Sequence, residues 1–354
     1  MNRSWRNAWI LALAVVAIVT IAYETFLRLH NYIATVQDDA DLWSIQYDRV
    51  KRDPRSVALL GASRIQYAVD PALLSKILGG RTVAMLPING QYPLAALRDL
   101  AENRNFAGLA IVGIDARGLA RRHWDMQQPY IDHYYERWSR ARWLHRQLAS
   151  VLQQHVVFLH SPFSLANMAR RFVAGFGLPF NDYVVLRPDR VGFLDYTRTN
   201  VAAIRARRIA DLNAYYQENP PPDAQSWLRD LAQVSQWVRQ IRARGGQVVF
   251  FREPATDEHL DIDEAHFPRE QYWDAYARVS PGMMIEFRDE PVFATFLLPD
   301  SSHIAGADVP RFTLALAQTL ERHKIVPPIA NWSPGATLGQ RGKIESHDPV
   351  ASFR

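Results

Sequence analysis

The chain has 354 residues, 48% of them hydrophobic, which is enough for one large α/β domain or two small ones with a sizeable core. It contains no cysteine, and this excludes disulfide bonds, cysteine metal sites and thiol chemistry. The net charge of +5 conceals a strongly basic middle, described below.

Residues 1–30 predict a membrane anchor. Arg3 and Arg6 precede residues 8–22, which carry no charge, and with its aromatic flanks the run reaches about 20 residues, enough to span a bilayer. The two arginines favour a cytoplasmic N-terminus, which would place the rest of the chain outside the cytoplasm. A cleaved signal peptide is the alternative, but residues 20–22 form a poor cleavage site, so we expect an uncleaved anchor.

The first strand of the domain is expected over residues 56–60, a short apolar run that follows a mixed, polar helix or stalk at 31–55. Asp70 and Pro71 then begin a helix, because Asp is a good N-cap and Pro suits the first helical position. Ser63 lies between them, where a buried strand turns toward a helix. In open α/β sheets, ligands bind at these carboxyl ends of the strands.

Two further strands follow, each leading to a residue of interest. Residues 82–86 predict a second strand, which leads into a turn that contains Gly90. Residues 109–114 predict a third strand, which is followed by Asp115.

The middle of the chain, from about 117 to 222, predicts a helical insertion. Residues 117–208 hold 15 Arg, no Lys and six acidic residues, interleaved with aromatic residues. Arginine with aromatics suits sugars, anions or an anionic membrane face, and equally a set of solvated helix faces. It also suits nucleic acid, but an exported domain should not meet nucleic acid. Residues 165–178 are apolar apart from two arginines and can lie against the membrane or cover the active-site cleft.

The last third of the chain predicts the rest of a βαβ sheet. A helix over 224–244 ends at two glycines and is followed by a strand at 247–251, with a further strand expected over 291–298. Between them, His259 and His266 lie in an acidic stretch that can bind a metal, although we expect a solvated loop and no metal site.

Asp300 and His303 follow the last predicted strand and precede a helix-like stretch at 308–323. Their spacing can place both side chains on one loop, so that the imidazole reaches Ser63 while the carboxylate holds the ring. A serine nucleophile needs such a base and such an orienting acid. Without these partners, Ser63 would be an ordinary turn serine.

The sequence Gly61-Ala62-Ser63-Arg64, together with Asp300-Ser301-Ser302-His303, resembles the first and last blocks of the SGNH (GDSL-like) hydrolase superfamily. It is similar to the membrane-anchored bacterial branch, which includes periplasmic polysaccharide O-acetyltransferases and proteins of the D-alanine transfer type. The resemblance covers roughly 56–85, 109–115 and 247–323 and leaves the long middle unmatched.

The resemblance implies a three-layer αβα, flavodoxin-like domain with a mostly parallel sheet. Ser63, His303 and Asp300 would be nucleophile, base and orienting acid, and the backbone N–H groups of Ser63 and Gly90 would hold the oxyanion. Many members carry Asn as a further oxyanion donor near the position of Asp115, and an ionised carboxylate there would repel an oxyanion. Either Asp115 has another role, or the further donor comes from elsewhere in the chain. We assign Arg64 and Asp115 to substrate binding.

The expected organisation is an anchor (1–30), a stalk (31–55), an SGNH-like domain (56–325) with its insertion, and a loose tail (326–354). The branch implies transfer of an acetyl or similar group to a cell-surface polysaccharide in the periplasm. Its implied partner is a membrane O-acyltransferase, as the donor, or a polysaccharide synthesis complex in the inner membrane, and no cofactor is needed. The alternatives are a periplasmic esterase of carbohydrate or lipid and a non-catalytic glycan-binding or assembly protein.

Overall fold

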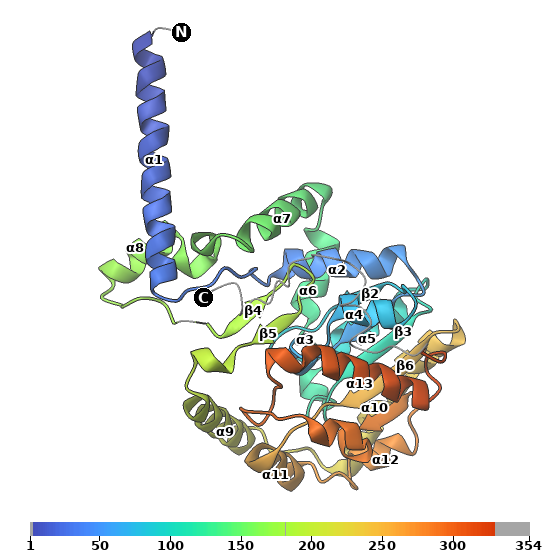
Figure 1. The fold of residues 1–354 in the computed structure, drawn as a ribbon. Coiled ribbons are helices and arrows are strands. Elements are labelled where there is room, and N and C mark those ends of the chain that lie inside the picture. Colours follow the sequence, from blue (N-terminus) through green and yellow to red (C-terminus); the bar gives the residue numbers. More distant parts are fainter. Residues whose placement is uncertain (1–2, 181, 330–354) are drawn as a thin grey trace.

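A five-stranded, fully parallel sheet forms the centre of the computed structural model, which describes residues 3–180 and 182–329 (Figure 1). The strand order is β2-β1-β3-β6-β7. The strands are β1 (Val57–Leu60), β2 (Val83–Met85), β3 (Leu109–Gly113), β6 (Gln247–Arg252) and β7 (Met283–Glu286). The first strand, β1, therefore lies next to the central strand β3. The chain adds β2 on one side of β1 and all later strands on the other side, so the strand order reverses between β1 and β3, which is where doubly wound folds bind ligands.

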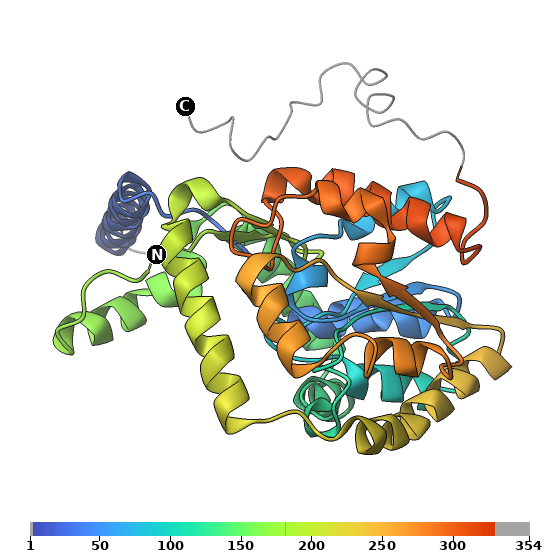
Figure 2. The same cartoon turned by 90° about the horizontal axis from the view of Figure 1, so that it is seen from below.

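Successive side chains of each strand enter two separate cores, one on each face of the sheet. Ala58 and Leu60 belong to one core, while Val57 and Leu59 belong to the other. The first core is covered by α2 (Ala40–Arg52), α5 (Leu94–Glu102), α6 (Gln128–Glu136), α10 (Ala224–Ala243) and α12 (Trp273–Ala277). The second is covered by α4 (Pro71–Ile77) and α13 (Val309–Arg322). Figure 2 shows α10 and α13 on opposite sides of the sheet, which confirms the predicted three-layer α/β fold.

Short-range signals located several elements correctly. Asp70 caps α4, its carboxylate accepting hydrogen bonds from the backbone N–H groups of Ala72 and Leu73. The predicted strands at 56–60, 82–86, 109–114 and 247–251 and the helices at 224–244 and 308–323 are also present. These segments pair a clear hydrophobic period with a cap or a glycine stop, so their own sequence determines their conformation.

The strand predicted over 291–298 is wrong. Residues Pro291–Thr295 form a 3₁₀ turn, and the last strand of the sheet is instead β7. Proline cannot donate to a strand ladder, and the apolar character of the run arises because Phe293 and Phe296 pack against Phe312 of α13. Strand β7 is only four residues long, so its own pattern gave little signal.

The region 117–222 is largely helical, as predicted. It contains α6, α7 (Arg140–Gln153), α8 (Leu165–Val173) and α9 (Val201–Glu218). It also contains an unpredicted antiparallel hairpin, β4 (Val184–Leu186) and β5 (Gly192–Leu194). Arg190 lies in the turn with φ +71° and is fully buried. Its charge is satisfied there, because the guanidinium donates to the carbonyls of Met85 and Pro87 and pairs with Asp38. Long-range contacts therefore hold this hairpin in place.

Two other expectations are corrected. The stretch with His259 and His266 is not a loop but helix α11 (Asp257–His266). Residues 31–55 are not a separate stalk, because Trp43 and Tyr47 of α2 are fully buried in the core of the domain. The tail expected over 326–354 begins with a buried residue, Val326, and its residues 330–354 lie outside the described part of the chain.

Helix α1 (Arg3–Leu29) projects away from the body (Figure 1). It is long and apolar enough to cross a membrane, with a mean hydropathy of 2.3 over its best 18-residue window. Only 6% of that window is buried inside the structure, unlike the core helix of a globular domain.

Candidate active site

Ser63 is the first residue of a one-turn helix, α3 (Ser63–Gln66), which begins immediately after β1. The turn is tight, because a Cβ at Gly61 would lie 2.9 Å from Cγ1 of Ile65. A Cβ at Gly113, at the end of the neighbouring β3, would lie 2.2 Å from the same atom. The two glycines thus let Ile65 of α3 pack closely against the ends of β1 and β3, and Ser63 lines the cavity at these strand ends.

The structure brings Ser63, His303 and Asp300 together. His303 Nε2 lies 2.8 Å from Ser63 Oγ, and His303 Nδ1 lies 2.9 Å from Asp300 Oδ2. An ionised carboxylate can only accept, so Nδ1 carries the proton and Nε2 is free to accept from the serine hydroxyl. The tautomer that the network assigns is the one a general base requires.

Asp300 is fully buried and its carboxylate accepts four hydrogen bonds. Oδ1 accepts from the backbone N–H groups of Ser302 and His303, at 3.0 and 2.7 Å. Oδ2 accepts from His303 Nδ1 and, at 3.0 Å, from Arg208 Nη2. Burial by itself would raise the pKa of Asp300, but the hydrogen bond and charge of His303 and the charge of Arg208 outweigh it, and the pKa is well below its usual value. Asp300 is therefore ionised at neutral pH.

His303 is buried, and burial lowers its pKa below the usual 6.5, although Asp300 opposes the shift. The positive charges of Arg208 and Arg64 lower the pKa further. The imidazole is consequently neutral at pH 7, which is the state able to take a proton.

Ser63 and Gly90 both line a cavity of about 320 Å³. Gly90 has φ +73°, a conformation in which glycine is unstrained. Within the residues described, neither the Ser63 nor the Gly90 backbone N–H donates to another backbone group. Both predicted oxyanion donors therefore border the same space.

Asp115 also lines this cavity, but its charge is compensated. Oδ1 accepts from the Gly118 backbone N–H at 2.7 Å, and Oδ2 lies 3.9 Å from the guanidinium of Arg64 and 3.6 Å from that of Arg117. The hydroxyl of Tyr92 approaches the same oxygen at 3.4 Å. Two cations therefore offset the repulsion that an isolated carboxylate would exert on an oxyanion.

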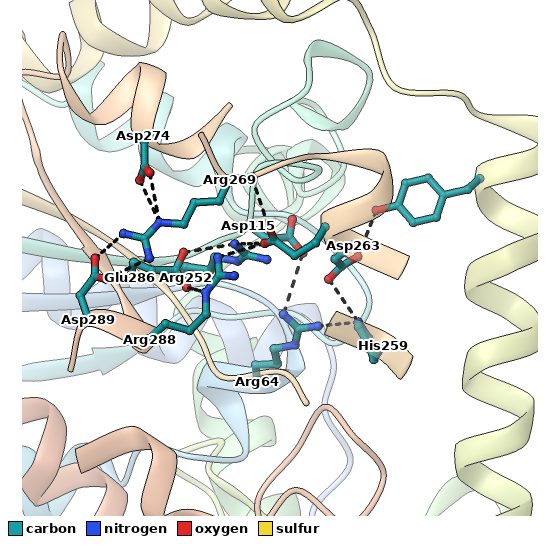
Figure 3. Close-up of polar contacts among 12 residues, drawn as sticks. Arg64, Asp115, Arg252, His259, Asp263, Arg269, Asp274, Glu286, Arg288 and Asp289 are labelled. Carbon is teal, nitrogen blue, oxygen red and sulfur yellow. Dashed lines mark hydrogen bonds and ion pairs between the residues drawn. The ribbon is translucent and has the colours of Figure 1, made fainter. Parts of the chain in front are cut away.

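Arg64 connects the serine helix with the loop that carries the base. Its Nε donates to Ser302 Oγ at 3.0 Å, and its Nη2 donates to His259 Nε2 at 2.8 Å. Figure 3 shows Arg64 between Asp115 and His259, with His259 next to Asp263. His259 Nε2 accepts this hydrogen bond and therefore carries no proton, so the ring is neutral, in keeping with a pKa that burial lowers. Arg64 is held by these contacts at the wall of the cavity that Ser63 lines, and its predicted role in substrate binding stays a prediction.

Three residues of this site were not identified from the sequence. Arg208 comes from α9 in the insertion, and only the tertiary fold brings it to Asp300. Ser302 lies within the Asp-x-x-His spacing but carried no signal of its own. Glu253 follows β6, is buried at the cavity wall, and has a pKa that burial raises to about 7.

The cavity has apolar, aromatic and cationic walls. Beyond the serine it is lined by Tyr92, Arg117, His123, Met126 and Tyr215. Its volume is at the lower end of the range of small-molecule pockets, about 300–1,000 Å³. In residues 3–180 and 182–329, no three Cys, His, Asp or Glu side chains are grouped as metal ligands would be.

Comparisons with known proteins add little to this geometry. No known protein family matches the chain, and no curated protein matches it. A solved structure titled "Crystal Structure of TesA" aligns with 76% of this chain and 99% of its own, at 13% sequence identity and a TM-score of 0.33.

Proposed function

We propose that this protein is a serine-dependent acyl-transfer enzyme of the SGNH type. The observation that carries the proposal is the continuous contact from Ser63 Oγ to His303 Nε2 and from His303 Nδ1 to Asp300, at 2.8 and 2.9 Å. A nucleophile, a base in the required tautomer and an orienting acid are the minimum set for this chemistry.

The reaction follows from these positions. Ser63 Oγ attacks the carbonyl carbon of an acyl donor while His303 Nε2 takes the hydroxyl proton, and the Ser63 and Gly90 N–H groups donate to the resulting oxyanion. Collapse of the tetrahedral intermediate breaks the bond to the leaving group, which receives the proton from His303. An acceptor hydroxyl then gives its proton to His303 and attacks the acyl carbon. The bond from that carbon to Ser63 Oγ breaks, and His303 returns the proton to Ser63 Oγ, which restores the free enzyme.

We propose acetyl or a similar small acyl group as the cargo and a polysaccharide hydroxyl as the acceptor. The resemblance to the anchored SGNH branch supports this, and the aromatic and cationic wall formed by Tyr92, Tyr215 and Arg117 suits a sugar. The donor partner would be a membrane O-acyltransferase, and α1 would hold the enzyme beside it in the inner membrane with its main domain in the periplasm.

The orientation is testable with a reporter fused after Arg354 in the full chain. Because Arg3 and Arg6 precede the apolar run, a reporter active only outside the cytoplasm should work there. Activity solely from a cytoplasmic reporter would reverse the topology and remove the periplasmic acceptor from consideration.

The function itself is tested with the purified full chain, an activated acetyl ester and an oligosaccharide acceptor. Wild type should release acetate slowly and transfer acetyl to the sugar faster, and Ser63→Ala should lose both activities while remaining folded. Release to water without transfer would indicate an esterase. Equal turnover by wild type and Ser63→Ala would refute the serine mechanism, and no turnover by either would point to a non-catalytic glycan-binding protein.

A further inference from the structure

An exposed apolar surface is formed by α7 and α8, which lie beside the C-terminal end of α1 (Figure 1). We call it the apolar platform: the outward face of α7, together with α8 and the loop that follows it. Its members are Leu144, Leu148, Val151, Leu152, Leu165, Phe172, Val173, Phe176 and Phe180, each more than half exposed. The α7 members recur at helical spacing and so share one face. Soluble surfaces rarely gather so many large apolar side chains, and such patches mark interaction sites.

The last turns of α1 are fixed to the segment that joins α7 and α8. The Glu24 carboxylate accepts from the backbone N–H groups of Val157 and Phe158, at 3.1 and 3.3 Å. The Tyr23 hydroxyl donates to the Phe163 carbonyl at 2.7 Å, and Leu27 is fully buried in this small core. The connecting segment is therefore held at a fixed position along the helix axis, beside the last turns of α1.

This position along the helix axis coincides with the end of the apolar part of α1. The helix carries no charge from residue 7 to 23, and Glu24 is its first charged residue after Arg6. A span of about 20 residues that begins near Arg6 ends close to Leu27, where the membrane interface should lie. Figure 1 shows α7 and α8 beside this end of α1, on the side of the body from which the helix rises.

The charge of the same region favours an anionic surface. Residues 137–180 include six arginines and no Asp or Glu, although the whole chain has 36 acidic residues. Arg170 and Arg171 lie within α8, directly before Phe172 and Val173. Basic residues beside exposed aromatic and aliphatic ones are the composition of helices that lie in a membrane interface.

We propose that the apolar platform lies in the headgroup region of the bilayer that α1 crosses, with anionic phospholipid as its partner. The α7 and α8 faces would enter the interface by about 5–10 Å while the arginines contact lipid phosphates. The domain would then be held at several points and could not swing freely about α1. This proposal does not depend on the catalytic role of Ser63.

The test uses the natural absence of cysteine. Full-length Val173→Cys and Leu148→Cys carry an environment-sensitive fluorophore. Val279→Cys is the matched control, because Val279 is an apolar residue outside the platform that is also more than half exposed. Each protein is placed in nanodiscs of phosphatidylcholine, alone or mixed with phosphatidylglycerol. Emission is quenched either by a nitroxide on the lipid acyl chain or by aqueous iodide. All three sites are exposed, so the substitutions remove no core contact.

The labels at 173 and 148 should be quenched by lipid nitroxide at least about twofold more strongly than the label at 279, and be shielded from iodide. Replacing Arg170 and Arg171 with Gln should abolish the additional quenching seen in the anionic lipid. Iodide access at 173 and 148 equal to that at 279 would overturn the proposal. Shielding from both quenchers would also overturn it, and would mean that a second copy or the chain's own cleft covers the platform.

Discussion

Replacing Asp300 with Asn should disable the enzyme by reversing the His303 tautomer. The carboxylate accepts two backbone N–H groups through Oδ1 and two side-chain donors, His303 Nδ1–H and Arg208, through Oδ2. An amide has one acceptor and one donor end. If its oxygen keeps the two backbone bonds, its NH₂ group faces His303 Nδ1, which must then accept.

The consequence is that His303 Nε2 carries the proton and can no longer take one from Ser63. The opposite amide orientation is less favourable, because NH₂ would then oppose two backbone donors that cannot move away. Wrong-tautomer substitutions of this kind reduce rates by about 10²–10⁴-fold, equivalent to about 3–5 kcal/mol of transition-state stabilisation. We expect Asp300→Asn to fall in this range and His303→Ala to match Ser63→Ala. The triple variant should be no slower than Ser63→Ala, because the three residues act as one unit.

The assay is kcat/KM for an activated acetyl ester, together with the rate at which a serine-directed probe labels Ser63, followed by mass spectrometry. Asp308→Asn is the matched control, since Asp308 lies near the same loop and pairs only weakly with Arg311 at 3.6 Å. Activity of Asp300→Asn within about threefold of the control would refute the orienting role. Probe labelling of His303→Ala at the wild-type rate would show that His303 is not the base.

Three further predictions follow from the same contacts. Because burial lowers the pKa of His303, kcat/KM should be constant near pH 7 and fall only below pH 6.5, and an acid limb above pH 7 would contradict this. Arg64→Ala removes the hydrogen bond to Ser302 and a positive charge that lowers the pKa of His303, so the fall of kcat/KM in acid should begin at a higher pH and kcat should decrease by about tenfold. Arg64→Lys keeps the charge and should restore the pH profile more fully than kcat. An unchanged pH profile in Arg64→Ala would show that the charge of Arg64 does not affect the pKa of His303. Gly113→Ala forces a Cβ to within 2.2 Å of Ile65, so unfolding free energy should drop by about 1–3 kcal/mol in a denaturant titration, whereas unchanged stability would mean that α3 shifts freely.

The sequence by itself determined the elements whose signals are local. The apolar run before Gly61, the Asp70 cap and the α10 period with its glycine stop each depend on residues a few positions apart. The charge-free stretch of α1 and the short Asp300–His303 spacing are equally local. Such signals persist because backbone propensity and side-chain period act before any distant contact forms.

Only the tertiary structure decided how the distant parts meet. Ser63 and His303 are 240 positions apart, and their 2.8 Å contact exists because the turn after β1, the neighbour of the central strand β3, meets the loop that precedes α13. Arg208 reaches Asp300 from the insertion that the resemblance leaves unmatched. The run 291–298 is apolar because residues such as Phe293 pack against Phe312, and this apolar character led to the wrong prediction of a strand. Burial and charge pairing between remote segments leave no periodic trace in the chain, so these features come from packing alone.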